Sequence, residues 1–353
     1  MPSILILAGG DGVRFWPRST RSRPKQFLPL AGGDRVMAAR TWDRAVALVG
    51  EERVFLVTGE RHEPLVRQFL PEVPESQILL EPEGRSTAAA VLLGCARIVS
   101  LRGEGEVVAV LPSDHRIADE RRFRSLLEVA LTWGRSGRML FFGVPPTRPE
   151  TGFGYLRIRP LPVRGIFQGV GFVEKPSEEE ARDLIRGGEV LWNTGIYVFQ
   201  VRRLAELAGR IDPRLREGYE GFLRAWRAQD GEERKRVHRS LPAISLEYAL
   251  LSRLSSFFVL PGDFGWDDLG DWRSLERIRP RDRDGNVSAG RAALLECRNC
   301  IVDEGSQRVA LFGVRDLVVA ACPEGVLVCP RDRVGELRCL MDHLKESGRA
   351  DWT

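Results

Sequence analysis

Glycines and two cations near the N-terminus could bind a polyphosphate. The segment reads Leu7-Ala8-Gly9-Gly10-Asp11-Gly12-Val13-Arg14, and Lys25 follows in Pro24-Lys25-Gln26-Phe27. Three glycines within four residues let backbone N–H groups approach phosphate oxygens closely. The third glycine of a dinucleotide-binding loop is missing, since Phe15 stands there, and no Gly-Lys-Ser or Gly-Lys-Thr of a P-loop follows. Arg14 and Lys25 could hold a triphosphate and stabilise the charge of a departing pyrophosphate.

The use of lysine supports a special role for Lys25. The chain contains four lysines, and nearly every other cation is arginine. Because ammonium and guanidinium groups bind phosphate differently, Lys25 and the lysine of Glu174-Lys175-Pro176 indicate positions that need a compact ammonium. A tight glycine-rich turn without a ligand remains the alternative for the N-terminal segment.

Strands and helices alternate along the first part of the chain and would position these residues. The strand Ser3–Leu7 ends directly before the glycine-rich loop, and Asp114 follows another strand, at the edge where ligands of open α/β sheets bind. The alternation predicts an α/β fold with a doubly wound, mostly parallel, Rossmann-like sheet covered by helices. Predicted strands are Ser3–Leu7, Arg53–Val57, Gln77–Leu80, Glu106–Leu111, Met139–Gly143, Tyr155–Arg159, Gly169–Glu174 and Gly195–Phe199; predicted helices are Val36–Val49, Thr87–Leu101, Glu120–Trp133, Ser177–Arg186, Pro213–Ala228 and Leu246–Arg253.

The pattern changes after Arg281, where the polar segment 281–286 predicts a domain boundary. We expect one domain over residues 1–285 and a small β-rich domain over residues 286–353, for which a β-helix is one arrangement. The C-terminal domain should serve stability or assembly and carry no catalytic residue, so a chain ending near Arg281 should keep detectable activity. Its predicted elements are the strands Ala293–Glu296, Arg308–Phe312, Leu317–Ala321 and Gly325–Cys329 and the helix Arg333–Glu346.

Composition excludes several classes of protein. A net charge of +4, spread along 353 residues, is too small and diffuse for a nucleic-acid-binding protein. No apolar run is long enough to span a bilayer, and the N-terminus lacks the basic region of a signal peptide, so a cytoplasmic protein is expected. Six cysteines are then reduced thiols. Zinc at Cys297 and Cys300 is the alternative, but Cys322 and Cys329 are spaced too widely for a second zinc knuckle.

Several short motifs follow one another in order from Leu5 to about Trp272. LAGGDGVRFWPRS and RPKQFLPL are followed by Glu81-Pro82, Leu111–His115, Pro149–Tyr155, Phe172–Pro176, Trp192–Gly195 and Trp266–Gly270. Together they resemble the sugar-1-phosphate nucleotidyltransferases, and Trp16-Pro17 with Pro24–Phe27 is similar to the mannose-1-phosphate guanylyltransferase branch. The resemblance implies that residues 1–285 form a nucleotidyltransferase catalytic domain, which would make GDP-mannose from GTP and mannose 1-phosphate.

The resemblance also implies roles for individual residues. It assigns catalysis to Arg14, Lys25, Asp114 and Asp268. Glu81 would bind the guanine edge, where a carboxylate can accept from a pair of donors. The other implied nucleotide-binding residues are Leu7, Ala8, Gly9, Gly10, Gly12, Thr87 and Ala88; the implied sugar-phosphate residues are Gly154, Glu174, Lys175 and Asn193, with Lys175 at the phosphate.

The implied cofactor is Mg²⁺, bound by Asp114 and Asp268 together with substrate phosphates and water. The spacing of the two aspartates along the sequence does not show that they lie together in the fold. Asp267 remains an alternative to Asp268 as the second ligand. His115 is expected to be a hydrogen-bonding residue beside Asp114 and not a ligand.

Two segments depart from the family pattern. Ser86-Thr87-Ala88-Ala89-Ala90 stands where the family usually shows Asn-Thr-Ala-Pro-Ala, and Ser86 could cap the helix that follows. Glu247 replaces a usual Asp. Both departures bear on base selectivity and on the packing of the pocket, and neither changes the class of reaction.

The expected reaction is an in-line displacement. A phosphate oxygen of mannose 1-phosphate attacks the α-phosphorus of GTP, and no protein nucleophile is needed because the attacking group is already an anion. GTP and mannose 1-phosphate are the expected partners, without nucleic acid or membrane, and the family suggests a homodimer. The alternatives are glucose 1-phosphate with dTTP or UTP, a non-catalytic nucleotide-sugar-binding homologue, and a glycosyltransferase using Asp282-Arg283-Asp284 as its metal motif.

Overall fold

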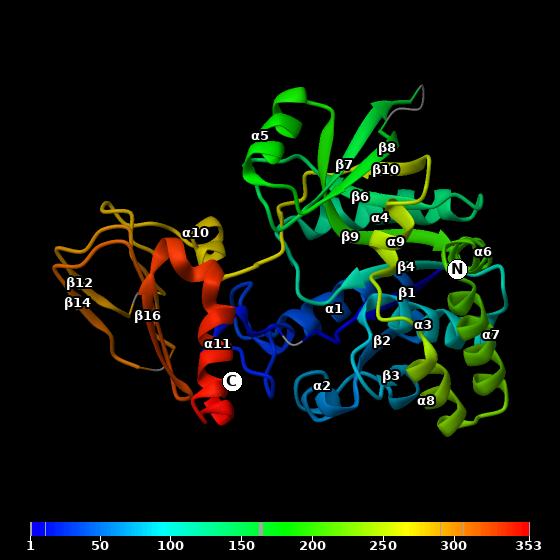
Figure 1. Cartoon of the computed structure of the whole chain (residues 1–353), viewed down its shortest axis with the longest axis horizontal. Coiled ribbons are helices and arrows are strands. Elements are labelled where there is room, and N and C mark those ends of the chain that lie inside the picture. Colours follow the sequence, from blue (N-terminus) through cyan, green and yellow to red (C-terminus); the bar gives the residue numbers. More distant parts are fainter. Residues whose placement is uncertain (1, 11, 162–164, 290, 306, 353) are drawn as a thin grey trace. The chain divides into compact units, whose positions relative to one another are not determined.

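The chain forms two compact units (Figure 1). The computed structural model describes residues 2–10, 12–161, 165–289, 291–305 and 307–352. Unit 1 comprises Met1–Gly9, Ala39–Ser113 and Ile117–Trp266, and unit 2 comprises Gly10–Ala38, Asp114–Arg116 and Asp267–Thr353. Unit 2 therefore combines the segment that carries Arg14 and Lys25 with the C-terminal part of the chain. The domain boundary expected at residues 285 and 286 stays a prediction.

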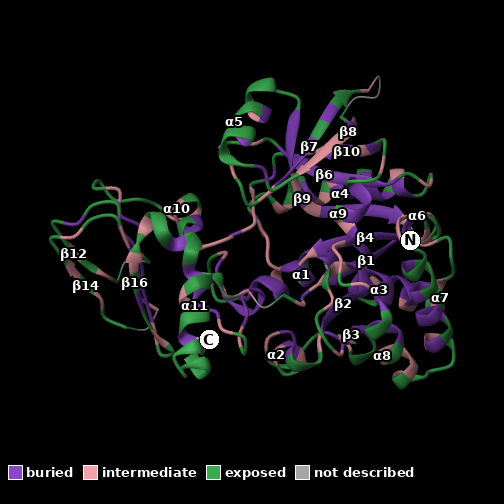
Figure 2. Ribbon diagram, viewed as in Figure 1, coloured by how far each residue is buried: buried purple, intermediate pink, exposed green. Residues whose placement is uncertain are grey.

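A nine-stranded sheet forms the centre of unit 1 in the part of the chain that the structure describes. Its order is β3-β2-β1-β4-β9-β6-β10-β8-β7. Strands β1, β2, β4 and β6 are buried along nearly their whole length, as Figure 2 shows, which explains their continuous apolar sequences. The strands are β1 (Ser3–Leu7), β2 (Val54–Gly59), β3 (Ile78–Glu81), β4 (Val107–Pro112), β6 (Leu140–Val144), β7 (Gly154–Pro160), β8 (Phe167–Glu174), β9 (Val190–Gln200) and β10 (Phe257–Pro261).

The directions of the strands make this a mixed sheet. Strands β3, β2, β1 and β4 are parallel, and β6 is parallel to β10. Strand β9 runs antiparallel to both of its neighbours β4 and β6, and β7 and β8 form an antiparallel pair. The predicted α/β class is confirmed, whereas the sheet is mixed and not mostly parallel. The half of the sheet from β3 to β4 keeps the parallel arrangement that the sequence predicts.

Helix α3 packs closely against the sheet and against α7. A Cβ atom at Gly94 would lie 2.4 Å from Cδ1 of Leu5 on β1, so glycine permits this close approach. Ser86 is the first residue of α3, with φ 63°, and Arg85 holds the cap position, so the predicted capping role of Ser86 is wrong. The helices before the C-terminal segment are α1 (Met37–Val49), α2 (Glu63–Phe69), α3 (Ser86–Arg102), α4 (Glu120–Gly134), α5 (Glu178–Gly187), α6 (Val201–Ile211), α7 (Pro213–Arg227), α8 (Gly231–Ser240) and α9 (Leu246–Leu251).

Short strands in parallel pairs form the C-terminal part of unit 2. Strand β12 (Ala293–Leu295) pairs with β14 (Ala310–Phe312), and β13 (Ile301–Asp303) pairs with β15 (Leu317–Cys322). Strand β16 (Gly325–Pro330) adds to β15 in the antiparallel direction. Strands β12 and β13 each pair in parallel with the next strand but one, as strands of neighbouring coils do in a β-helix. The remaining elements are the paired strands β5 (Arg116–Ile117) and β11 (Trp266–Asp267) and the helices α10 (Leu275–Ile278) and α11 (Leu337–Glu346).

The cysteines of the CxxC motif pack inside these strands. Cys297 and Cys300 are buried in an apolar cluster with Val302, and their Sγ atoms lie 3.3 and 3.4 Å from the carbonyl oxygens of Leu295 and Arg298. Among the residues described, no group of three His, Cys, Asp or Glu side chains could hold a metal ion. The structure thus agrees with packed thiols. In the same part of the chain, no helix is long and apolar enough to cross a membrane.

Candidate active site

The first part of the glycine-rich loop lies in unit 1, at the end of β1. The backbone N–H of Ala8 donates to the carbonyl of Val57, and the Thr58 hydroxyl donates to the carbonyl of Ala8, at 2.8 and 3.0 Å. A Cβ atom at Gly9 would lie 3.1 Å from Oε2 of Glu81, at the end of β3. The loop therefore leaves the sheet beside the carboxylate of Glu81, and glycine at position 9 leaves room for that carboxylate.

The second part of the loop lies in unit 2 and contacts the turn Lys25–Phe27. The Gln26 side chain donates to the carbonyl of Gly10 at 2.9 Å. Gly12 has φ +46°, and a Cβ atom there would lie 2.7 Å from the backbone nitrogen of Lys25. The glycine-rich loop and the Pro24–Phe27 motif thus form one local structure. Glycine is needed at position 12 because the backbone there is left-handed and because Lys25 approaches it closely.

Replacing Gly12 by Ala should therefore destabilise unit 2 and displace Lys25. We expect a loss of about 1–3 kcal/mol from backbone strain and overpacking, and at least a tenfold loss of activity, measured by thermal unfolding and by pyrophosphate release. Gly10→Ala is the matched control for stability, because its Cβ atom would meet no atom within 4 Å. Equal melting temperatures for the two variants would contradict this explanation.

Lys25 joins two of the predicted catalytic residues. Its buried ammonium forms an ion pair with Oδ2 of Asp114 at 2.8 Å and donates to the backbone carbonyl of Asp268. Asp114 lies two residues after β4, and Asp268 lies after β11, so the fold brings together residues that are 154 positions apart. Arg14, on the 3-10 turn Val13–Phe15 of the same unit, is exposed.

The two aspartates have opposite electrostatic surroundings. Burial raises the pKa of Asp114, but the Lys25 ammonium and His115 more than offset it, and the pKa lies below its usual range. Burial raises the pKa of Asp268 to about 6; Lys25 opposes this, while the carboxylates of Asp267 and Asp114 add to it. Asp114, Asp267 and Asp268 together face two fixed cations, Lys25 and Arg277, and the excess of negative charge favours a further cation.

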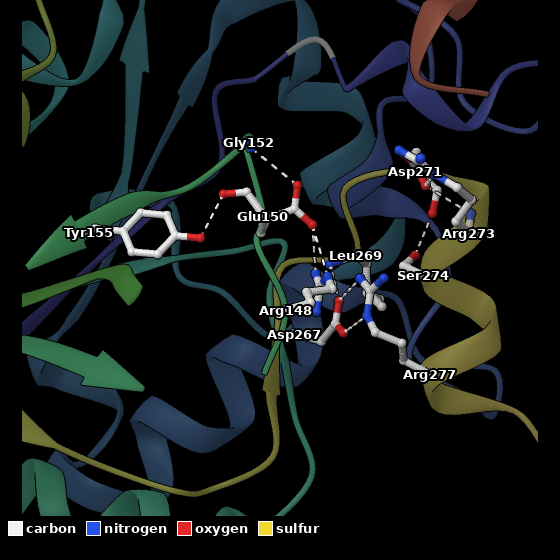
Figure 3. A network of polar contacts seen from close by, with 10 residues as sticks. All are labelled: Arg148, Glu150, Gly152, Tyr155, Asp267, Leu269, Asp271, Arg273, Ser274 and Arg277. Atoms are coloured by element: carbon white, nitrogen blue, oxygen red, sulfur yellow. Dashed lines mark hydrogen bonds and ion pairs between the residues drawn. The ribbon is translucent and has the colours of Figure 1, made fainter. Parts of the chain in front are cut away.

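Asp267 is held by structural contacts (Figure 3). Its carboxylate forms an ion pair with Arg277 at 2.5 Å and accepts the backbone N–H of Leu269 at 2.8 Å. Asp282, which belongs to the alternative metal motif, accepts the backbone N–H groups of Asp284 and Asn286 in a turn. Both carboxylates stabilise local backbone and are poorly placed to bind a metal.

Glu81 has a buried partner that the sequence does not reveal. Nε2 of His238 lies 3.1 Å from Oε1 of Glu81, and the residues are 1% and 6% exposed. His238 belongs to α8 and shows no motif, so a sequence reading has no signal for it. The pair fixes one carboxylate oxygen of Glu81, while the other lies beside Gly9.

Thr87 and Ala88 are fixed by the chain before α9. The Thr87 hydroxyl accepts the backbone N–H of Leu246 at 3.0 Å, and the N–H of Ala88 donates to the carbonyl of Ile244 at 3.1 Å. Their side chains are thus used within the fold, and Ala88 is completely buried. A nucleotide that binds here would contact the exposed surface of this turn and not the buried Ala88 side chain.

The predicted sugar-phosphate residues lie on neighbouring strands of unit 1. Gly154 on β7 pairs with Glu174 on β8, and a Cβ atom at Gly154 would lie 2.6 Å from the Phe172 ring and 3.0 Å from Oε2 of Glu174. The Lys175 ammonium lies 3.5 Å from the Glu174 carboxylate. The preceding loop is ordered by Glu150, which accepts the N–H of Gly152 at 3.1 Å.

Asn193 lies on β9 beside Glu247, at the start of α9. Burial raises the pKa of Glu247 to about 7; the Asn193 amide opposes this and the Glu174 carboxylate adds to it. Within the described part of the chain, three buried atoms here have no hydrogen-bond partner: Asn193 Oδ1, Glu247 Oε1 and Trp192 Nε1. The fold thus gathers Glu174, Asn193 and Glu247, and Glu247 was noted in the sequence only as a departure from the family.

A mixed α/β sheet, a glycine-rich loop after its first strand and a buried lysine between two aspartates define a nucleotide-binding phosphoryl-transfer protein. The chain belongs to the nucleotidyl transferase family, whose model matches residues 3–285, as a sugar-1-phosphate nucleotidyltransferase. A second model, the MannoseP isomerase/GMP-like beta-helix domain, matches residues 290–344. The family resemblance and the β-rich C-terminal domain are thereby confirmed.

Three similar proteins define the relationship further. The xanthan biosynthesis protein XanB of Xanthomonas campestris pv. campestris is 35% identical over 99% of this chain and 74% of its own length. A mannose-1-phosphate guanylyltransferase of Escherichia coli is 32% identical over 99% of this chain and 75% of its own length. A crystal structure described as mannose-1-phosphate geranyltransferase from Thermus thermophilus has a TM-score of 0.89 and 37% identity, covering 98% of this chain and 99% of that one.

Proposed function

We propose that this chain transfers the guanylyl group of GTP to mannose 1-phosphate and releases pyrophosphate. The observation that carries the proposal is Lys25, whose buried ammonium is bound by Asp114 and by the backbone of Asp268 in the same unit as the glycine-rich loop. The names of the Escherichia coli relative and of a 31% identical relative from Klebsiella pneumoniae, both mannose-1-phosphate guanylyltransferases, support the choice of substrates.

In the proposed reaction, the glycine-rich loop and the two cations of unit 2 bind the triphosphate. Backbone N–H groups around Gly10 and Gly12 approach the phosphates, and Arg14 and Lys25 neutralise charge that builds on the leaving pyrophosphate. The sugar phosphate attacks the α-phosphorus directly, with Lys175 at its own phosphate. Catalysis is then positioning and charge stabilisation, without a covalent intermediate on the protein.

Mg²⁺ is the proposed cofactor, and the donor set fits it. Mg²⁺ prefers oxygen ligands and is usually held by one or two carboxylates together with substrate phosphates. Asp114 and Asp268 would hold it, because the Asp267 carboxylate is bound to Arg277. When bound, the metal would neutralise phosphate charge and orient the phosphates for in-line displacement.

The proposal is tested by measuring pyrophosphate release across pairs of nucleoside triphosphates and sugar 1-phosphates. We expect the highest kcat/KM for GTP with mannose 1-phosphate. Faster turnover of dTTP or UTP with glucose 1-phosphate would refute the choice of substrates and favour the alternative transferase. Absence of turnover with every pair, while nucleotide-sugars still bind, would favour a non-catalytic homologue.

Glu81 is expected to select GTP. Replacing it by Gln or Ala should lower the preference for GTP over ATP by about 5- to 150-fold, which corresponds to the loss of about 1–3 kcal/mol of matched hydrogen bonding to the base. The measurement is the ratio of kcat/KM for GTP to that for ATP. His238→Gln is the control, because it keeps a donor toward the carboxylate of Glu81. An unchanged ratio in the Glu81 variants would rule out this role.

A further inference from the structure

The segment before and at the start of α9 connects two predicted subsites. The carbonyl of Ile244 accepts the N–H of Ala88, and the N–H of Leu246 donates to the Thr87 hydroxyl, so the segment holds the turn predicted to bind the nucleotide. Glu247 is the next residue. Its side chain interacts with Asn193 on β9, and the carboxylate of Glu174 on β8 acts on it electrostatically. Asn193 and Glu174 are both predicted to bind the sugar phosphate.

The polar atoms around Glu247 are incompletely satisfied. Oε1 of Glu247, Oδ1 of Asn193 and the indole N–H of Trp192 are buried, and none of them has a hydrogen-bond partner among the residues that the structure describes. Leaving a buried polar atom unpaired costs about 1–3 kcal/mol, so such a group within a small region indicates a missing hydrogen-bonding partner. Atoms that both donate and accept, as sugar hydroxyls do, would satisfy a carboxyl, an amide oxygen and an indole N–H together.

We propose that Glu247 is a binding and specificity-determining residue for the sugar phosphate, which hydrogen-bonds a hydroxyl of the sugar. The inference rests on the proposed function for the class of ligand, a sugar 1-phosphate. It adds a third oxygen-bearing group to Glu174 and Asn193.

The charge state of Glu247 follows from what faces it. Glu174 on β8, which is paired with Lys175, acts on the Glu247 carboxyl, and Glu247 and the Cys95 thiol on α3 act on the phenol of Tyr197 on β9. Neither Glu174 nor Tyr197 can supply a positive charge, and Glu174 repels a second anion. Burial and Glu174 raise the pKa of Glu247 to about 7. Below that pH the neutral acid can donate to a hydroxyl, and above it the donor is lost.

The test compares Glu247→Met, which keeps length without polarity, with Glu247→Gln, which keeps a neutral donor and acceptor. We expect Glu247→Met to raise the KM for mannose 1-phosphate about tenfold, and to raise its Kd, measured by calorimetry, by a similar factor. The KM for GTP should change less than about twofold. At pH 6 the KM of Glu247→Gln for mannose 1-phosphate should stay within about threefold of the wild-type value. The rise of sugar-phosphate KM with pH above 7 should be smaller in Gln than in the wild type, a comparison that cancels the titration of the substrate phosphate.

The outcome does not depend on the identity of the sugar. The same comparison is made with glucose 1-phosphate, so a wrong assignment of mannose changes which ligand binds and not the effect of Glu247. Equal increases of KM for GTP and for the sugar phosphate would show a structural role and overturn the proposal. So would unchanged binding of both sugar phosphates to a folded Glu247→Met protein. If Met does not fold, Glu247→Asp and Gln supply the same comparison.

Discussion

Asn in place of Asp114 should lower kcat by about 100-fold or more, with a smaller effect on the binding of GTP. The substitution keeps the shape of the side chain and removes the anion that pairs with Lys25 at 2.8 Å. The attacking and the attacked phosphates are both anions and repel each other. Without the Asp114 carboxylate, the site no longer holds positive charge in the place where it would offset this repulsion. Steady-state kinetics of pyrophosphate release, with binding of GTP measured separately, gives both quantities.

The Asp268→Asn change should lower kcat by a much smaller factor in the Asp114→Asn variant than in the wild type. Two residues that act as one unit give losses that do not multiply, because the first change has already broken the unit. Both single variants and the double variant should also need more Mg²⁺ for half-maximal activity. Fully multiplicative losses, or near-normal turnover in EDTA, would show that the two residues do not share a metal.

Asp267→Asn is the matched control for this cycle. The residue is adjacent in sequence, but its carboxylate is bound to Arg277 and Leu269. We expect a lower melting temperature and an Mg²⁺ requirement close to that of the wild type. A strong shift of the Mg²⁺ requirement in this variant would make Asp267 the ligand instead.

Truncation after Arg281 should remove most of the activity, at least about 100-fold, since a misplaced catalytic group alone costs this much. The sequence predicts that such a chain keeps detectable activity if soluble; the packing within unit 2 leads us to expect that little of it remains. Phe15 and Trp16, directly after the loop, share a buried cluster with Ile301, Val318 and Met341. Removing those residues exposes the apolar support of Arg14 and Lys25. Pyrophosphate release by the truncated chain is the measurement.

Polar contacts reinforce the same support. The Trp16 indole donates to the carbonyl of Trp352 at 2.7 Å, and the Trp272 indole donates to the carbonyl of Trp16 at 3.0 Å. Arg18 pairs with the buried carboxylate of Asp303 at 2.6 Å. The segment that carries the predicted catalytic cations is therefore fixed by the C-terminal residues of its own unit.

A milder variant keeps the prediction testable if the truncated chain does not fold. Met341→Ala should cost about 2–5 kcal/mol, because Met341 is 2% exposed in this cluster. It should lower kcat together with the melting temperature. Val328→Ala is the control, since Val328 is 60% exposed and should tolerate the change. A truncated chain with the kcat of the full chain would disprove the supporting role.

The sequence predicts features that depend on neighbouring residues. The order of strands and helices from Ser3 to Val144 follows from local apolar patterns, and most predicted bounds lie within two residues of those observed. The glycine-rich loop is also local, because the left-handed backbone of Gly12 and the turn at Lys25 lie 13 positions apart. Helix α6 is missed because it follows β9 without a loop, and α2 because it is only seven residues long.

Tertiary structure decides what depends on distant residues. The direction of β9 between β4 and β6 is set by pairing across the sheet, which periodicity does not encode. His238 reaches Glu81 across 157 positions, and no motif marks it. Asp267 and Asp268 have nearly identical sequence surroundings, so the sequence does not distinguish them. Only the fold shows that Arg277 forms an ion pair with Asp267, while Asp268 lies beside Lys25. The grouping of Arg14 and Lys25 with the C-terminal strands has the same cause, since burial of Phe15 and Trp16 needs apolar partners that lie some 300 residues away in the chain.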